Sequence, residues 1–268
     1  MSKNLPDKAI MTVDNLSWQV DQLSILKQIS FDLMPEEVVG IIGPNGSGKS
    51  SLLKCIYRRY QDFTGRVSLC GKPTEDYQQR QLAKNLAVVS QEPESNFEIK
   101  TIDIVRMGLV PHKGLFEFDN KNDENKLSQA LAKVDLLNKS EQLFSSLSGG
   151  EKQRALIARA LVQEPNIFLM DEPTNHLDIQ HQIEIMQLIR QLGIGTIVTM
   201  HDLNLAANFC DRLILLNNGE IVVQGSIEEV LNSEHIAKVF EVQVRVDKNP
   251  FSQLPQIALN YHQSGREG

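Results

Sequence analysis

The stretch VVGIIGPNGSGKS, residues 38–50, joins a short apolar run to a glycine-rich turn. Its last eight residues, GPNGSGKS at 43–50, fit the pattern G-x-x-x-x-G-K-[ST] without a mismatch. The apolar run predicts a buried strand, and residues 51–60 place Leu52, Leu53, Ile56 and Tyr57 on one face of a predicted helix. A strand, this turn and a helix form the context in which the pattern binds phosphate. We therefore predict a phosphate-binding loop.

The loop residues have separate tasks in this prediction. Glycines allow main-chain N–H groups to approach phosphate oxygens, and the following helix adds the positive end of its dipole. Lys49 supplies a charge for the β- and γ-phosphates, and the Ser50 hydroxyl can bind Mg²⁺. The alternative is a glycine-rich turn without a ligand. We assign nucleotide binding to Gly43, Pro44, Asn45, Gly46, Ser47, Gly48, Lys49, Ser50 and Ser51.

A second glycine-bearing motif, LSGGE at residues 147–151, opens a predicted helix that runs to about Val162. Ser148 suits the N-cap of that helix. The alternative is that the Ser148 hydroxyl and the exposed N–H groups face an anion, which the two glycines favour. A single nucleotide site normally uses one phosphate-binding motif, so the presence of two such motifs in one chain requires an explanation.

Polar residues also follow three predicted strands. IFLMDE, residues 167–172, ends in two carboxylates, of which Asp171 suits Mg²⁺ and Glu172 suits the polarisation of an attacking water. His201 follows the strand 196–200, and Gln91 closes the strand 86–90, where its amide could reach Mg²⁺ and water. The carboxyl ends of parallel strands share one edge, so we expect these groups together. The alternatives are a solvated acidic turn, an incidental histidine and a surface glutamine.

Length and composition narrow the class of protein. A chain of 268 residues with 41% hydrophobic content suits one large α/β domain, or one domain with a subdomain and a tail. A net charge of −7 without a basic stripe argues against a nucleic-acid partner. Three scattered cysteines predict inert thiols in a reducing compartment. A polar start and strand-sized apolar runs predict a cytoplasmic protein without signal peptide or membrane span.

The chain also shows an internal division. Residues 10–34 alternate polar and apolar side chains, which predicts an antiparallel β region. Residues 101–143 have helical character and form an insertion between β-rich parts. Asn217-Asn218-Gly219 predicts a hairpin. A late strand is expected at 243–247, and beyond Pro250 we expect a polar tail that is poorly ordered at its end.

The ordered set GPNGSGKS, Gln91, LSGGE, IFLMDE, Asp178 and His201 resembles that of ATP-binding cassette (ABC) ATPases over roughly residues 10–245. The resemblance implies an α/β P-loop NTPase core, an antiparallel β subdomain, a helical subdomain at about 92–160 and a tail at 246–268. It implies ATP and Mg²⁺ as cofactors. It implies catalytic roles for Glu172, His201, Lys49 and Gln91. His201 and Gln91 would also contact the nucleotide, and the metal would be bound by Ser50, Gln91 and Asp171.

The same resemblance explains the two glycine motifs. Two copies of an ABC ATPase stack head to tail, with each ATP between the phosphate loop of one copy and the LSGGE motif of the other. Ser148, Gly149, Gly150 and Glu151 would then complete the partner's site, and Asp178 would communicate across the dimer. ABC ATPases usually stack adenine on an aromatic residue at a position that is Val20 here. Trp18 shares the face of Val20 on a strand, so we expect Trp18 to stack; the alternative is core packing.

Other segments of the sequence resemble those of the ATPases of bacterial iron–siderophore, haem and vitamin B12 importers. These segments are residues 101–109, 111–116, 178–182, 201–207 and 240–246. The resemblance implies a homodimer on integral membrane permease subunits at the cytoplasmic face of the inner membrane, served by a periplasmic or lipid-anchored binding protein. Residues 91–110 would receive the permease. The expected cargo is a ferric siderophore, then haem, then cobalamin; the alternatives are another cargo, or a non-transport ABC ATPase with a macromolecular partner.

Overall fold

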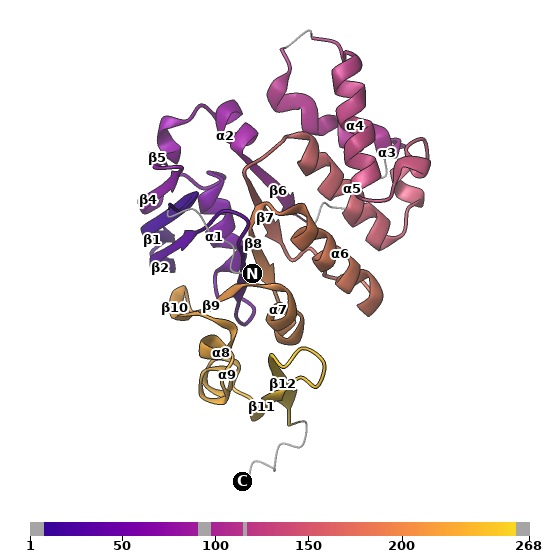
Figure 1. Cartoon of the computed structure of the whole chain (residues 1–268). Coiled ribbons are helices and arrows are strands. Elements are labelled where there is room, and N and C mark those ends of the chain that lie inside the picture. The colour runs from indigo at the N-terminus through magenta and orange to yellow at the C-terminus, as the bar shows by residue number, and fades with distance from the viewer. Residues whose placement is uncertain (1–7, 91–97, 115–116, 261–268) are drawn as a thin grey trace.

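The computed structural model describes residues 8–90, 98–114 and 117–260, and it is built around a six-stranded sheet (Figure 1). The strand order is β10-β9-β3-β8-β7-β6, with the inner neighbours parallel and β10 antiparallel to β9. The strands are β3 (Val38–Ile42), β6 (Leu86–Ser90), β7 (Ile167–Asp171), β8 (Gly195–Met200), β9 (Arg212–Asn217) and β10 (Glu220–Gly225). The predicted strands and the hairpin at residues 217–219 are confirmed.

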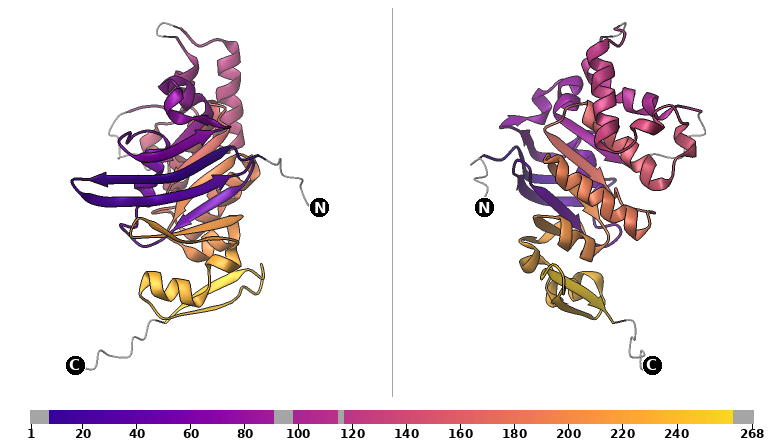
Figure 2. Two further views of the ribbon diagram at one scale, coloured as in Figure 1. Left: turned by 90° about the vertical axis from the view of Figure 1, so that its left-hand side faces the viewer. Right: turned by 45° about the vertical axis from the view of Figure 1, so that its right-hand side comes forward.

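A second, antiparallel sheet covers one face of the central sheet, with the order β2-β1-β4-β5. Figure 2 shows the two sheets as stacked layers. The strands are β1 (Met11–Val20), β2 (Leu23–Leu33), β4 (Thr64–Leu69) and β5 (Lys72–Pro73). The antiparallel β region predicted for residues 10–34 is therefore confirmed.

The fully apolar strand β3 is explained by cores on both of its faces. Val39 and Ile41 pack with α1 (Lys49–Ile56) and the antiparallel sheet, whereas Val38 and Ile42 pack with the helices on the opposite face. A strand buried on both sides loses the alternation of polar and apolar residues. All five residues of β3 are buried.

Most of the helices lie on the other side of the central sheet (Figure 2). The predicted helical insertion contains α3 (Thr101–Arg106), α4 (Lys121–Lys133) and α5 (Gly149–Val162), joined by 3₁₀ turns. The α5 helix packs against both α3 and α4. Gly108 shows how closely the insertion packs, since a Cβ there would lie 2.1 Å from the carbonyl oxygen of Arg159 on α5. The remaining helices are α2 (Gln79–Asn85), α6 (Ile179–Leu192), α7 (Leu203–Phe209), α8 (Ile227–Val230) and α9 (Ser233–Phe240).

Two helices, α1 and α6, end close to a residue with a positive φ. The helix after the phosphate loop, α1, ends at Ile56, earlier than the predicted residue 60, and Arg58 has a positive φ of 60°. Gly193 ends α6 in the left-handed conformation, as glycine at this position predicts. Within the described ranges, no helix combines the length and apolar character needed to cross a bilayer.

The C-terminal part is more structured than the sequence predicts. The strand β11 (Val244–Lys248) pairs with β12 (Pro255–Leu259), so the predicted boundary between domain and tail at residues 245 and 246 falls inside a strand. The hairpin is attached to α7. The Asn204 amide donates to the Ile257 carbonyl at 3.2 Å and accepts the Ile257 N–H at 2.7 Å, and Ile257 is buried.

We predict that Asn204→Ala detaches the hairpin, because both main-chain groups of Ile257 lose their partner. The expected loss is about 1–3 kcal/mol of unfolding free energy. Hydrogen exchange should accelerate within residues 244–259. Asn208→Ala is the control, since that side chain donates to the Asn204 carbonyl of its own helix and has no hydrogen bond to the described part of the hairpin. Equal exchange in both variants would contradict the assignment.

Candidate functional site

The phosphate loop connects the buried strand β3 to α1, and its backbone requires glycine. Gly43 has a φ of 152°, and a Cβ there would lie 2.0 Å from the carbonyl oxygen of Leu216. Gly48 caps α1 with a φ of 106°. The Ser47 hydroxyl is buried and, among the described residues, has no hydrogen-bond partner. Buried hydroxyls normally have partners, so the loop has the form of a site for a polar ligand.

Lys49 points into the loop from the first turn of α1. The side chain is buried, and its ammonium donates to the carbonyl oxygens of Gly43 at 2.9 Å and Pro44 at 3.1 Å. Burial lowers the pKa of Lys49, while the nearby carboxylates of Glu172 and Asp171 oppose that shift. Main-chain carbonyl groups of the loop therefore already orient the Lys49 ammonium.

Asp171 and Ser50 meet at the carboxyl edge of the sheet. Asp171 Oδ1 accepts the Ser50 hydroxyl at 3.0 Å and the Thr199 hydroxyl at 2.8 Å. This oxygen-rich pair fits a hard divalent cation such as Mg²⁺, which commonly takes few protein ligands and completes its shell with water and phosphate. The described residues contain no group of three or more His, Cys, Asp or Glu side chains suited to a metal.

Glu172 turns away from Asp171. Its φ is 51°, and its carboxylate is held by two residues. His201 Nε2 lies 2.5 Å from Glu172 Oε1, and the Asn175 amide donates to Oε2 at 3.2 Å. Glu172 also lines a cavity of about 320 Å³ with Ile25 and residues 45–51 of the phosphate loop. The expectation that the acid pair, His201 and the loop lie together is met in the described residues.

Sequence reasoning missed Thr199 and Asn175. Thr199 is fully buried in β8 and contacts both members of the acid pair, since it also accepts the Glu172 N–H at 2.9 Å. One signal could have found it: a hydroxyl residue two positions before His201, in a strand expected beside the acid pair. Asn175 lies three residues after Glu172, and its sequence position gives no comparable signal.

The LSGGE motif begins α5, and the capping role of Ser148 is present. Ser148 Oγ accepts the Glu151 N–H at 3.3 Å, and the Glu151 carboxylate accepts the Ser148 N–H at 3.0 Å. Glu151 also pairs with Lys139, and these hydrogen bonds lower the pKa of Glu151. Ser148 and Gly149 are exposed, and none of residues 148–151 lines the phosphate-loop cavity.

Comparison with known proteins decides the family. The family model described as "ABC transporter" matches residues 26–175. The chain belongs to the ABC transporter family. It is 34% identical to the hemin import ATP-binding protein HmuV of Pseudoalteromonas translucida, over 94% of this chain and all of that protein. It is 37% identical to the petrobactin import ATP-binding protein FpuC of Bacillus anthracis, over 82% and 83% of the two chains.

Solved structures agree with this assignment. An inward-facing metal-chelate type ABC transporter superimposes with a TM-score of 0.83 and 26% identity, over 94% of this chain and 98% of that chain. The protein is therefore an ABC ATPase, with the P-loop NTPase core expected from the sequence. This ABC ATPase binds ATP.

The surroundings of Trp18 in the ABC ATPase favour one of the two roles considered for it. The indole is only 8% exposed, stacks on Tyr60 with ring centroids 4.3 Å apart, and donates its N–H to Asp62 at 3.0 Å. These contacts give Trp18 a packing role and count against adenine stacking. The pairing of β1 with β2 shifts register on both sides of Trp18, and Trp18 is buried whereas Val20 is 41% exposed.

The sequence also predicts Asp178 and Gln91 as functional residues. Asp178 caps α6 by accepting the His181 N–H at 2.9 Å, and it also contacts His181 Nδ1 at 2.8 Å. Both bonds lower the pKa of Asp178, whose side chain is 67% exposed and so open to a partner. Gln91 lies outside the described residues.

We predict that Trp18→Phe destabilises the ABC ATPase without weakening ATP binding. The loss of the hydrogen bond to Asp62 and of part of the stack on Tyr60 should cost about 1–3 kcal/mol of unfolding free energy. Chemical denaturation and ATP titration measure the two effects. Lys49→Ala provides the contrast, since it should abolish ATP binding. Weaker ATP binding with unchanged stability in Trp18→Phe would reinstate the adenine role.

Proposed function

We propose that this ABC ATPase powers the import of an iron chelate, as a head-to-tail homodimer bound to membrane permease subunits. The observation that carries the proposal is the separation of the two glycine motifs. The phosphate loop and Glu172 share a cavity, whereas residues 148–151 lie outside it with Ser148 exposed. A second copy offers the partner that such a half-site requires. Asp178, also exposed, is assigned to the same interface.

The chemistry assigned to each copy follows from its contacts. Residues 43–51 bind the phosphates, with Lys49 as the charged group. Ser50 and Asp171 hold Mg²⁺, together with Gln91, and the ion supplies charge neutralisation at the phosphates. Glu172 polarises the attacking water as general base. His201 fixes Glu172 through its hydrogen bond and contacts the γ-phosphate. Ser148, Gly149, Gly150 and Glu151 complete the partner's site, so hydrolysis needs the dimer.

Import is supported by the relatives, whose names assign them to hemin import and petrobactin import. The metal-chelate type of the structural neighbour points to the same chemical class. We propose a ferric siderophore first and haem second as cargo. The chain then works at the cytoplasmic face of the membrane, with a substrate-binding protein on the other side. In this proposal the ATPase acts on the cargo only through the permease subunits.

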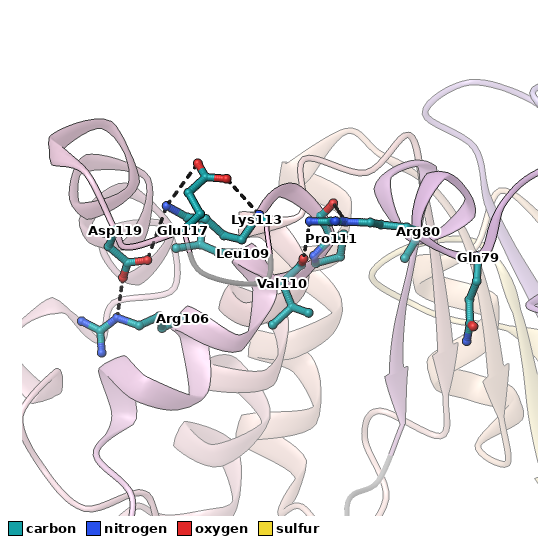
Figure 3. Close-up of a pocket in the computed structure, with 11 residues that line it drawn as sticks. Gln79, Arg80, Arg106, Leu109, Val110, Pro111, Lys113, Glu117 and Asp119 are labelled. Atoms are coloured by element: carbon teal, nitrogen blue, oxygen red, sulfur yellow. Dashed lines mark hydrogen bonds and ion pairs between the residues drawn. The ribbon is translucent and has the colours of Figure 1, made fainter.

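A groove between α2 and the helical insertion suits the permease (Figure 3). It has a volume of about 700 Å³ and runs from Gln79 and Arg80 to Lys113 and Asp119. Arg80 spans it by donating to the Pro111 carbonyl at 2.9 Å. Arg106 and Lys113 pair with acidic neighbours: Arg106 with Asp103 and Asp119, and Lys113 with Asp119 and Asp123.

The apolar edge of the groove remains open. Val110, which lines the groove, is 66% exposed, and Met107 three residues earlier is 45% exposed, while Leu109 is buried. Because the cations are already paired, the surface offered to a partner is mainly aliphatic. This surface overlaps the segment 91–110 that the sequence assigns to the permease, of which residues 98–110 are described. We propose that a short cytoplasmic helix of the permease docks here.

We predict that Glu172→Gln accumulates as an ATP-bound dimer. Loss of the general base should lower kcat by about 10²- to 10⁴-fold, while ATP binding persists. Size-exclusion chromatography with light scattering, with and without ATP, measures the change from monomer to dimer. Glu220→Gln, on an exposed carboxylate of β10, should behave as the unmodified protein. A Glu172→Gln protein that stays monomeric with saturating ATP would refute the sandwich dimer.

We predict that Val110→Asp uncouples the ATPase from its permease. A charge on the aliphatic edge should abolish copurification with the permease subunits and reduce cellular uptake of labelled ferric siderophore and haem. ATP binding by the isolated chain should not change. Phe251→Asp is the matched control, because Phe251 is 95% exposed in the C-terminal hairpin. Normal copurification of Val110→Asp would place the docking surface elsewhere. Uptake of neither cargo by the unmodified system would refute the iron-chelate proposal.

A further inference from the structure

Thr199 places its hydroxyl inside a buried strand. The strand β8 is buried along its whole length, and Thr199 is fully buried. Its hydroxyl has two hydrogen bonds of good length. It donates to Asp171 Oδ1 at 2.8 Å and accepts the main-chain N–H of Glu172 at 2.9 Å. One hydroxyl therefore contacts both residues of the acid pair.

The sheet register brings these groups together. Asp171 and Thr199 are paired neighbours in the parallel strands β7 and β8. Paired residues of adjacent strands direct their side chains to the same face, so the Thr199 hydroxyl lies beside the Asp171 carboxylate. Serine or threonine can fill this place, because the position requires one group that both donates and accepts. Valine has nearly the same shape but neither capacity.

The chain changes direction directly after Asp171. Glu172 has a φ of 51°, in the left-handed region that non-glycine residues adopt infrequently. The Thr199 oxygen holds the N–H at this turn. As a result, Asp171 faces Ser50, whereas the Glu172 side chain faces His201 and Asn175.

We propose that Thr199 is a positioning residue that assigns the two carboxylates to separate tasks. By donating to Asp171 Oδ1, it keeps that carboxylate beside Ser50. By accepting the Glu172 N–H, it holds the turn that sends the second carboxylate to His201. The catalytic consequence rests on the proposed function, in which Asp171 binds the cation and Glu172 polarises the attacking water. The hydrogen bonds themselves are testable without catalysis.

The test compares Thr199→Val, Thr199→Ser and Thr196→Val. Thr196 is an ideal control, because it is also fully buried in β8 but donates to the Ile194 carbonyl, away from the acid pair. Thr199→Val should lower kcat for ATP about 10- to 100-fold, the usual cost of losing a group that orients a ligand, and raise the Mg²⁺ concentration at half-maximal rate. KM for ATP should change less than about threefold, since the phosphate loop is untouched.

The other variants and a second readout separate positioning from a packing effect. Thr199→Ser should recover kcat to within about threefold, because the hydroxyl returns. Thr196→Val should keep the kcat of the unmodified protein. In nucleotide-free protein, hydrogen exchange at the Glu172 amide should accelerate about tenfold or more in Thr199→Val and not in Thr199→Ser. If Thr199→Val does not fold, Thr199→Ala provides the same comparison.

The results that overturn the proposal are distinct. Unchanged kcat in Thr199→Val, an equal loss in Thr199→Ser, or an equal loss in Thr196→Val would each reject the positioning role. Unchanged amide exchange in Thr199→Val would reject the hydrogen bond on which it rests. Failure of the proposed function would instead appear as absent ATP-driven uptake in the unmodified system, with the exchange difference between the Thr199 variants preserved.

Discussion

The parallel register of β3, β8, β7 and β6 is the constraint on which the site depends. Ile42 pairs with Met200, and Asp171 pairs with Ser90 on one side and Thr199 on the other. The ends of these strands are therefore level, and the residues that follow them meet at one edge of the sheet. The cores on the two faces fix this register, since a shift by one residue would exchange the side chains that pack in the two cores. Packing far from the nucleotide thus positions the chemistry.

The sequence predicts the parts of the fold that local patterns encode. Apolar, β-branched runs identify β3, β7 and β8, because strands buried on both faces tolerate few other residues. Gly193 identifies the end of α6, and Asn218-Gly219 identifies the turn between β9 and β10. The site residues at strand ends follow from the same reasoning, since a parallel sheet collects them at one edge. That inference needs only the strand boundaries and the sheet type.

Contacts between distant segments are harder to predict from the sequence. The ring of Trp18 is covered by Tyr60, which follows α1 and lies 42 positions later, so no motif indicates the pair. The hairpin of β11 and β12 depends on Asn204 of α7, and its exposed strands resemble a polar tail. Thr199 was hidden for another reason. A threonine in a buried strand fits β propensity, and only its neighbours reveal the role of the hydroxyl.

Packing also explains why the LSGGE motif needs its second glycine. A Cβ on Gly150 would lie 2.4 Å from the His181 ring, so even alanine would require the His181 side chain or its helix to shift. The same ring is hydrogen-bonded to Asp178 through Nδ1. The two elements that we assign to the partner's site are therefore in contact through one side chain. His181 therefore links the start of α5 to Asp178, the N-cap of α6. Glycine at position 150 thus serves packing within the chain, and Ser148 and Gly149 remain the exposed part of the motif.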